Sequence, residues 1–185
     1  GQMQAELGKL IKQFEGALEH VNRISASCTE EEWVRRPTSG GWSAAECVAH
    51  LNLTALPYRN IFPNAIDEAK RIGGGAPGRL RKDLVGWLIF QAVKPNGRVK
   101  SKAAAAFVPA SARTKSELLA EFIDLQNENI AAVRRCEGLP IHKVKVVSPI
   151  DERAKYSVYS ALCTLAAHNE RHLIQAERAL EKPAA

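Results

Sequence analysis

The sequence predicts an all-α protein, built as a four-helix bundle with long connecting loops. Three observations support this fold class. Four segments place apolar side chains at the spacing of one buried helix face. Three segments begin with Ser or Thr followed three residues later by Glu, which is the pattern of a capping box. No segment shows the convincing alternation of apolar and polar residues that a half-buried strand requires.

The first long helix is expected over residues 4–25. Seven apolar side chains recur there at helical spacing: Leu7, Leu10, Ile11, Phe14, Leu18, Val21 and Ile24. A capping box of Thr29 and Glu32 then opens a short helical turn that ends before Pro37. Gly40 and Gly41 break the chain before the next helix.

A second capping box, Ser43 with Glu46, begins the helix that carries His50. Pro57 predicts either a kink or an early end of this helix, because proline removes a backbone hydrogen bond. Residues 58–72 nevertheless keep helical spacing.

Glycine and proline divide the middle of the chain. The run Gly-Gly-Gly-Ala-Pro-Gly at 73–78 predicts a flexible break. A helix is expected over 79–93, and Pro95 prevents it from continuing. Residues 97–114 form a long, basic, alanine-rich connection without clear periodicity. Loops of this length inside a domain are uncommon and often functional.

The last two long helices follow. Thr114 and Glu117 form the third capping box, and the helix they begin should end at Gly138. Residues 141–147 have the character of one short extended piece. A polar turn then leads to the final helix, over residues 158–180.

Length and composition predict one domain over residues 1–185, long enough to bury a core without staples. Gly1 and Gln2 precede Met3, so we interpret Gly1 as a tag remnant. No signal peptide is evident, and the best apolar run, 84–93, is about half the length of a membrane span. The four cysteines lack paired spacing, which favours reduced, mostly buried thiols in a cytoplasmic protein.

A pair of histidines in the last helix is the strongest indication of function. His168 and His172 are four residues apart, so both imidazoles lie on one helix face and can bind one divalent metal ion. A core stripe runs beside that face (Leu162, Leu165, Ala166, Leu173 and Ala176), which predicts that the imidazoles point partly inward. If the helix that carries His50 packs against it, three nitrogens meet at one ion and leave positions open for water or substrate. Because binding needs neutral imidazoles, occupancy should fall as the pH drops through the histidine range.

Other polar residues near this pattern have competing roles. Glu46 lies one turn before His50 and is a candidate general base or hydrogen-bond partner, although its capping box already engages it. Cys47 offers a thiolate, but a small buried residue is the favoured interpretation. Gln175 shares the face of His168 and either hydrogen-bonds an imidazole or a ligand water, which is the favoured interpretation, or simply packs.

The spacing differs from that of the zincin proteases. Those enzymes have Glu directly after the first histidine, where this chain has Asn169, while Glu170 should face solvent or a neighbouring helix. His20 and His142 are expected to lie away from the site. Any chemistry must therefore come mainly from the metal.

Positive charge is concentrated between residues 70 and 102. Nine Lys or Arg residues stand there against one acid, Asp83, although the net charge of the whole chain is only +6. No nucleic-acid-binding motif accompanies this charge, so binding of DNA or RNA is disfavoured. A solvated connection is one interpretation, and attraction of an anionic small molecule to the site is the better motivated one.

These residues resemble the DinB-like superfamily, which includes the YfiT-type metal-dependent hydrolases. The resemblance rests on Gly41-Trp42-Ser43 with Glu46 and His50-Leu51, on Tyr-Ser-Ala-Leu at 159–162, and on His168-Asn-Glu-Arg-His172 with Gln175. Pro95, Lys100, Phe107-Val-Pro109 and the helix from Ser116 follow the same layout.

The resemblance implies a four-helix bundle with an unusual helix order, often dimeric, that holds a divalent metal, commonly nickel or zinc. Transferred to this chain, the ligands are His50, His168 and His172. Better-understood relatives are transferases and isomerases that use a low-molecular-weight bacterial thiol. We therefore expect a metal-dependent hydrolase or thiol transferase that acts on a small molecule. The alternative is a non-catalytic, stress-linked binding protein with a vestigial or structural metal.

Overall fold

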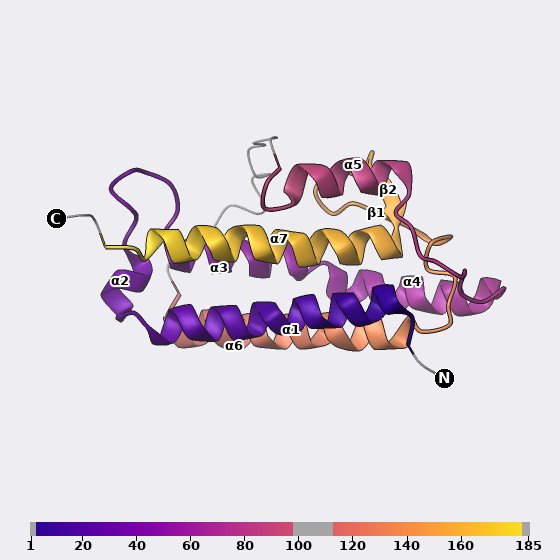
Figure 1. Cartoon of the computed structure of the whole chain (residues 1–185), viewed down its shortest axis with the longest axis horizontal. Helices are drawn as coiled ribbons and strands as arrows, with labels where there is room; N and C mark the ends of the chain where they lie inside the picture. Colours follow the sequence, from indigo (N-terminus) through magenta and orange to yellow (C-terminus); the bar gives the residue numbers. More distant parts are fainter. Residues whose placement is uncertain (1–2, 98–112, 183–185) are drawn as a thin grey trace.

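Four helices form the bundle that the sequence predicts: α1 (Ala5–Ala26), α3 (Ala44–Ala55), α6 (Lys115–Arg135) and α7 (Val158–Ala179). The computed structural model describes residues 3–97 and 113–182. Helix α1 packs against α6 and α7, and α3 packs against the same two helices, so α1 and α3 lie diagonally opposite each other (Figure 1). The predicted fold class is confirmed, and the expected start of the last helix at residue 158 agrees with the structure.

Full capping boxes begin two of the helices. In each box the hydroxyl of Thr29 or Ser43 accepts a hydrogen bond from the backbone N–H of Glu32 or Glu46, whose carboxylate accepts from the cap residue's own N–H. These boxes start α2 (Glu30–Val34) and α3 where the sequence predicts them. Because this interaction is local, the pattern predicts the helix start without tertiary information.

The third predicted box is only half formed. At the start of α6, the Thr114 hydroxyl accepts from the Glu117 N–H at 3.1 Å. The Glu117 carboxylate accepts from the same hydroxyl at 2.9 Å and not from the Thr114 amide. The predicted helix start is correct, but a bond from the Thr114 hydroxyl to the Glu117 carboxylate replaces the expected bond from the Thr114 amide.

Pro57 lies between two separate helices. Helix α3 ends at Ala55 and α4 (Tyr58–Ile72) begins three residues later, while Leu56 and Pro57 keep right-handed helical dihedral angles. Of the two alternatives, the early end of the helix is therefore the correct one, and the predicted helix over 58–72 is confirmed.

The predicted helix over 79–93 is wrong at its beginning. Helix α5 (Leu84–Val93) starts five residues later, because Asp83 adopts an extended backbone and accepts from the Gly86 N–H as a cap. The preceding residues are tied to α1, since the Leu80 N–H donates to the Glu6 carboxylate at 2.7 Å. This contact between distant segments competes with helix formation, and the sequence pattern does not reveal it.

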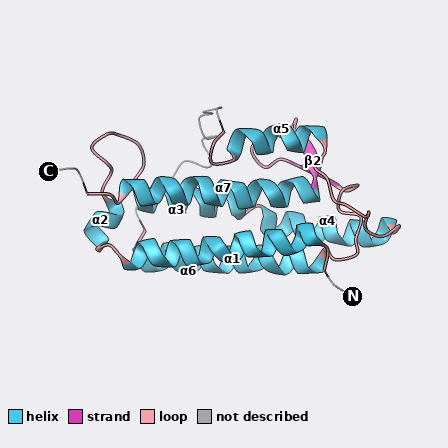
Figure 2. Cartoon of the chain, in the orientation of Figure 1, coloured by secondary structure: helices cyan, strands magenta, loops and turns pink. Residues whose placement is uncertain are grey.

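A small hairpin corrects the prediction of one extended piece at 141–147. Strand β1 (Lys145–Val147) pairs antiparallel with β2 (Lys155–Ser157), and Val146 stands opposite Tyr156. Both of these side chains are buried in the core. Strands of three residues are too short to show an alternating pattern, so the second strand escaped sequence analysis. Figure 2 shows β2, in magenta, beside the helices.

Asp83 joins α5 to the hairpin and to the start of α7. Its carboxylate accepts from the Ser157 N–H at 2.9 Å and the Ser160 hydroxyl at 2.7 Å, and it pairs with Lys145 at 3.2 Å. Burial alone would raise the pKa of Asp83, but these bonds together hold it well below its usual range. At Gly86 a Cβ atom would collide with the Ser160 side chain, so glycine permits the close approach of α5 to α7.

The outer face of α5 is apolar and exposed. Leu84, Trp87 and Leu88 have 73%, 47% and 55% of their surface accessible. No helix within the described ranges combines the length and apolar character that a membrane crossing requires. The residues after Gly97 that the sequence analysis singled out, Lys100 and the Phe107-Val-Pro109 segment, lie outside the described residues, as does Gly1.

The core consists of two apolar clusters, and α7 contributes to both. Leu162 belongs to the cluster shared with α4 and the hairpin, whereas Leu173 belongs to the cluster that contains Trp33. The histidine segment 168–172 lies along α7 between these two residues. The histidine segment is thus held between two well-packed regions of the core, which restricts the movement of its backbone.

Candidate metal centre

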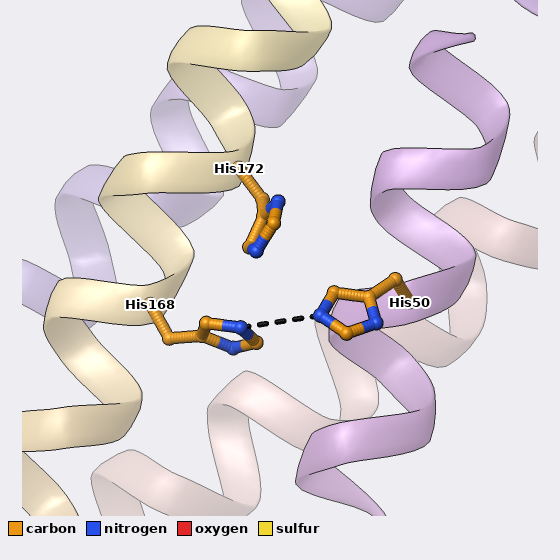
Figure 3. A group of neighbouring side chains, drawn as sticks. All are labelled: His50, His168 and His172. Carbon is orange, nitrogen blue, oxygen red and sulfur yellow. Dashed lines mark hydrogen bonds between the residues drawn. The ribbon is translucent and has the colours of Figure 1, made fainter. Parts of the chain in front are cut away.

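Three histidine side chains from two facing helices meet at one point. His50 on α3 and His168 and His172 on α7 each contribute a ring nitrogen, and the three nitrogens lie within 4.8 Å of one another. Figure 3 shows the rings converging in the space between the two helices. The structure therefore brings together the three histidines that the sequence analysis selected.

Local sequence explains why both helices present these residues correctly. The capped start of α3 at Ser43 places His50 two turns into the helix, on the side that faces α7. Ser157 caps α7 by accepting from the Ser160 N–H. Leu173, next to His172, is fully buried in the cluster that also contains Val48, so the helix faces are held in register around the histidines.

The spacing of the nitrogens fits a shared metal ion. The Nε2 atoms of His50 and His168 are 3.2 Å apart. Two nitrogens bound tetrahedrally to one zinc ion at its usual bond length would lie about 3.3 Å apart. The ring centroids are 4.5–4.9 Å apart with interplanar angles of 68–82°, so the rings approach edge to face around a common centre. Little movement is needed for the three histidines to hold a divalent ion.

No carboxylate or thiol within residues 3–97 and 113–182 joins this group. Three imidazole ligands are the donor set of open zinc and nickel centres, whereas structural zinc sites have four protein ligands. The cluster therefore suits an ion that keeps a coordination position for a small molecule.

Burial keeps the two α7 imidazoles neutral. Desolvation lowers the pKa of His168 well below its usual value, and the neighbouring His172 and His50 lower it further. Desolvation and His50 together lower the pKa of His172 to about 4, although its bond to Gln175 opposes the shift. At neutral pH both side chains are in the form that binds a metal ion.

Each α7 histidine has a hydrogen-bond partner on the side away from the centre. The Nδ1 atom of His172 lies 2.8 Å from the Oε1 atom of Gln175, as the sequence analysis expected of that glutamine. The Nδ1 atom of His168 lies 3.4 Å from the Thr54 hydroxyl. Such partners orient metal-binding imidazoles and select their tautomer.

Trp42 covers one side of the cluster. Its ring centroid lies 4.9 Å from that of His50 and 6.0 Å from that of His172. The indole is only partly buried and packs against the cluster that contains Trp33. It therefore forms an apolar wall between the histidines and solvent.

Comparison with known proteins identifies the family. The family description "DinB superfamily" matches residues 13–176, which is most of the chain. This protein belongs to the DinB superfamily. No curated protein and no solved structure gives a significant match.

In this DinB protein, Glu46 is occupied by an ion pair. Its two carboxylate oxygens accept from Arg36 at 2.8 and 2.7 Å, and one of them also accepts from the Ser43 N–H. The bonds from Arg36 are the main cause that lowers the pKa of Glu46, although partial burial opposes them. These contacts favour the capping role of Glu46 over proton transfer.

Cys47 behaves as a small core residue. It is fully buried in the apolar cluster of Val48, and burial raises the pKa of its thiol to about 12. The described cysteines form no disulfide. The thiolate that would bind a metal ion is therefore strongly disfavoured at this position.

The remaining polar residues of the α7 motif face away from the cluster. Asn169 is buried and donates to Gln126 on α6 at 2.8 Å, and Glu170 accepts from Gln13 on α1 at 3.3 Å. The expectation that Glu170 faces solvent or a neighbouring helix is thus met by a contact with α1. His20 and His142 are both outside the three-histidine group.

Thr54 and Trp42 contact the histidines, and the sequence did not predict either contact. Thr54 follows His50 by four residues, so helical spacing alone places it on the same face. Trp42 precedes the helix cap, and its position over the rings depends on the loop that carries it. Spacing could have revealed the first contact but not the second.

Proposed function

We propose that this protein is a metal-dependent thiol transferase acting on a small electrophilic molecule. The observation that carries the proposal is the convergence of His50, His168 and His172, two of which burial keeps neutral. A divalent zinc or nickel ion held there would lower the pKa of a bound thiol or water and make it nucleophilic at neutral pH.

The surroundings favour a thiol over water as the nucleophile. Metal-dependent hydrolysis commonly uses a nearby carboxylate as a general base. Among the described residues no carboxylate joins the histidines, and Glu46 is held by Arg36. Residues 98–112 contain no Asp or Glu in the sequence. A thiol brings its own acidic proton: its sulfur bonds to an electrophilic carbon, the leaving group departs with its electron pair, and the proton passes to water.

The chain's own residues would position the reactants. Gln175 and Thr54 orient the imidazoles on α7, and the Trp42 indole offers an apolar surface beside the cluster. These contacts hold the histidines in place and restrict the approach of water from the side that Trp42 covers.

The proposal has two separable tests. Protein purified without a metal affinity column should contain about one equivalent of zinc or nickel by elemental analysis. His168→Ala should abolish this binding, whereas His142→Ala, outside the cluster, should not. Equal metal content in both variants would refute the site.

Turnover is then measured with panels of small thiols plus electrophiles and of simple esters. We expect metal-dependent consumption of thiol and little ester hydrolysis. Ester hydrolysis without thiol use would identify a hydrolase. Stoichiometric metal with no turnover in either panel would favour the stress-linked binding protein.

We also propose that the thiol is anionic and is attracted by the basic segment 70–102. Asp83, the one acid in this segment, is already paired with Lys145. Arg171 donates to the Ala92 carbonyl at 2.7 Å, so the end of α5 lies beside the α7 turn that carries the histidines. Lys94, which follows α5 directly, would add positive charge there and raise the local concentration of an anionic substrate.

Charge reversal tests this recruitment. Lys94→Glu, with reversals of Arg98, Lys100 and Lys102 outside the described residues, should weaken binding of an anionic thiol and leave the metal content unchanged. Reversal of Arg153, an exposed residue already paired with Asp151, serves as the control. DNA binding that rests on phosphate contacts should weaken steeply as the salt concentration rises. Tight DNA binding that persists at physiological salt, with no affinity for thiols, would contradict the proposal.

A further inference from the structure

We propose that Thr54 is a positioning residue that selects the tautomer of His168 and leaves its Nε2 atom free to bind the metal ion. This inference rests on the metal-binding part of the proposed function and not on the reaction. The hydroxyl of Thr54 lies beside the Nδ1 atom of His168, so its effect acts through that imidazole.

The direction of the hydrogen bonds around Thr54 carries the argument. The Thr54 side chain is buried, and its hydroxyl donates to the Leu51 carbonyl at 2.9 Å. A hydroxyl has one proton but two lone pairs. Because the proton is already used, the Thr54 oxygen can only accept from His168 Nδ1, which lies 3.4 Å away.

The bond determines which nitrogen of His168 carries the proton. A neutral imidazole has a single N–H, so protonation at Nδ1 leaves Nε2 with a lone pair. Nε2 is also the atom that lies 3.2 Å from His50 Nε2 at the centre of the cluster. With its proton on Nδ1, His168 can only accept in this contact, so the lone pair of its Nε2 atom already faces the centre of the cluster before an ion arrives.

The second histidine of α7 has the same arrangement from a different residue. The Gln175 carbonyl oxygen accepts from Nδ1 of His172 at 2.8 Å. Two partners from different helices thus prepare two neighbouring rings in one tautomer. Thr54 on α3 provides the acceptor oxygen for His168, and Gln175 on α7 provides the acceptor oxygen for His172.

Substitution of Thr54 separates the hydrogen bond from packing. Thr54→Val keeps the branched shape and removes the acceptor, whereas Thr54→Ser keeps the acceptor. We expect Thr54→Val to weaken zinc binding by about 10-fold to 100-fold, the usual effect of losing such a partner, and Thr54→Ser to restore most of it. Thr164→Val is the matched control, because Thr164 lies one turn before His168 and its hydroxyl has no hydrogen-bond partner.

The tautomer itself is a readout that does not require metal. Long-range ¹H–¹⁵N spectra of the metal-free protein should show His168 protonated at Nδ1 in the wild type, in Thr54→Ser and in Thr164→Val. Thr54→Val should shift the signals toward a tautomer mixture. Far-UV circular dichroism confirms that each variant is folded.

Two results would overturn the inference. One is a Thr54→Val protein that keeps both its zinc affinity and the Nδ1–H tautomer. The other is a Thr54→Ser protein as weak as Thr54→Val, which would assign the effect to packing. If the wild type binds neither zinc nor nickel, the proposed function fails, but the tautomer spectra still decide the role of Thr54.

Discussion

Acidification should destabilise the metal-free protein through His172. Burial and the neighbouring His50 lower the pKa of this imidazole to about 4, whereas an unfolded histidine titrates near 6.5. Because the folded-state pKa is the lower one, the unfolded chain binds the proton first. The stabilising contribution is therefore complete above about pH 6.5 and is lost as the pH falls toward 4.

The magnitude follows from these two pKa values. Between pH 7.5 and 5.0, a group that shifts from about 6.5 to about 4 on folding loses about 2 kcal/mol of stability. His168 adds to the loss in the same direction, since its pKa is also lowered by burial. Most carboxylates titrate below this window, so their contribution is small and common to all variants.

Urea unfolding with a chelator present measures this effect. The free energy of unfolding of the wild type and of His172→Gln is determined at pH 7.5 and at pH 5.0. We expect the wild type to lose about 2 kcal/mol more than the variant over this interval. Equal losses in the two proteins would show that the surroundings of His172 do not lower its pKa, and the physical argument for the site would fail.

The same burial changes the expected pH dependence of metal binding. From the sequence, metal occupancy should fall through the ordinary histidine range. In the structure, His168 and His172 resist protonation until lower pH. For His172, the loss of metal is therefore expected closer to pH 4 than to pH 6.5, and the lowered pKa of His168 acts in the same direction.

Two further predictions concern packing and cysteine reactivity. Gly86→Ala should destabilise the protein by about 1–3 kcal/mol, because the added Cβ would collide with a serine of α7. Gly8→Ala should stabilise it by about 0.5–1 kcal/mol, because a Cβ at this helical position meets no atom within 4 Å. Thermal unfolding distinguishes them, and equal melting temperatures would contradict the tight contact between α5 and α7. In the native protein a thiol reagent should modify the partly exposed Cys28 first, while Cys47, with its pKa raised to about 12, should react only after unfolding. Cys28→Ser should therefore remove the fast phase, and an unchanged fast phase would place the reactive thiol elsewhere.

Local patterns were sufficient to predict most helices. The capping boxes at Thr29 and Ser43 and the apolar spacing of α1 and α7 depend on residues within one or two turns of each other. Such interactions are encoded in neighbouring positions, so they can be identified without the fold. The same reasoning selected His168 and His172, because a four-residue spacing implies a common face.

Contacts between distant segments account for the errors. Helix α5 starts late because Asp83 is engaged by β2 and α7, and the residues before it are held by Glu6. The strand β2 exists because it pairs with β1 and buries Tyr156, not because its three residues show a pattern. Neither cause is visible in the local sequence.

The sequence by itself determined the helical class of this protein, the starts of the helices that follow Thr29, Ser43 and Thr114, and the three histidines as candidates, because all of these follow from local spacing and residue chemistry. Only the tertiary structure decided how those histidines behave. The packing of α3 against α7 brings His50 to the other two, and burial lowers the pKa of His168 and His172. The same packing places Thr54 beside His168. Distances and desolvation depend on which helices become neighbours, and that is a property of the folded chain.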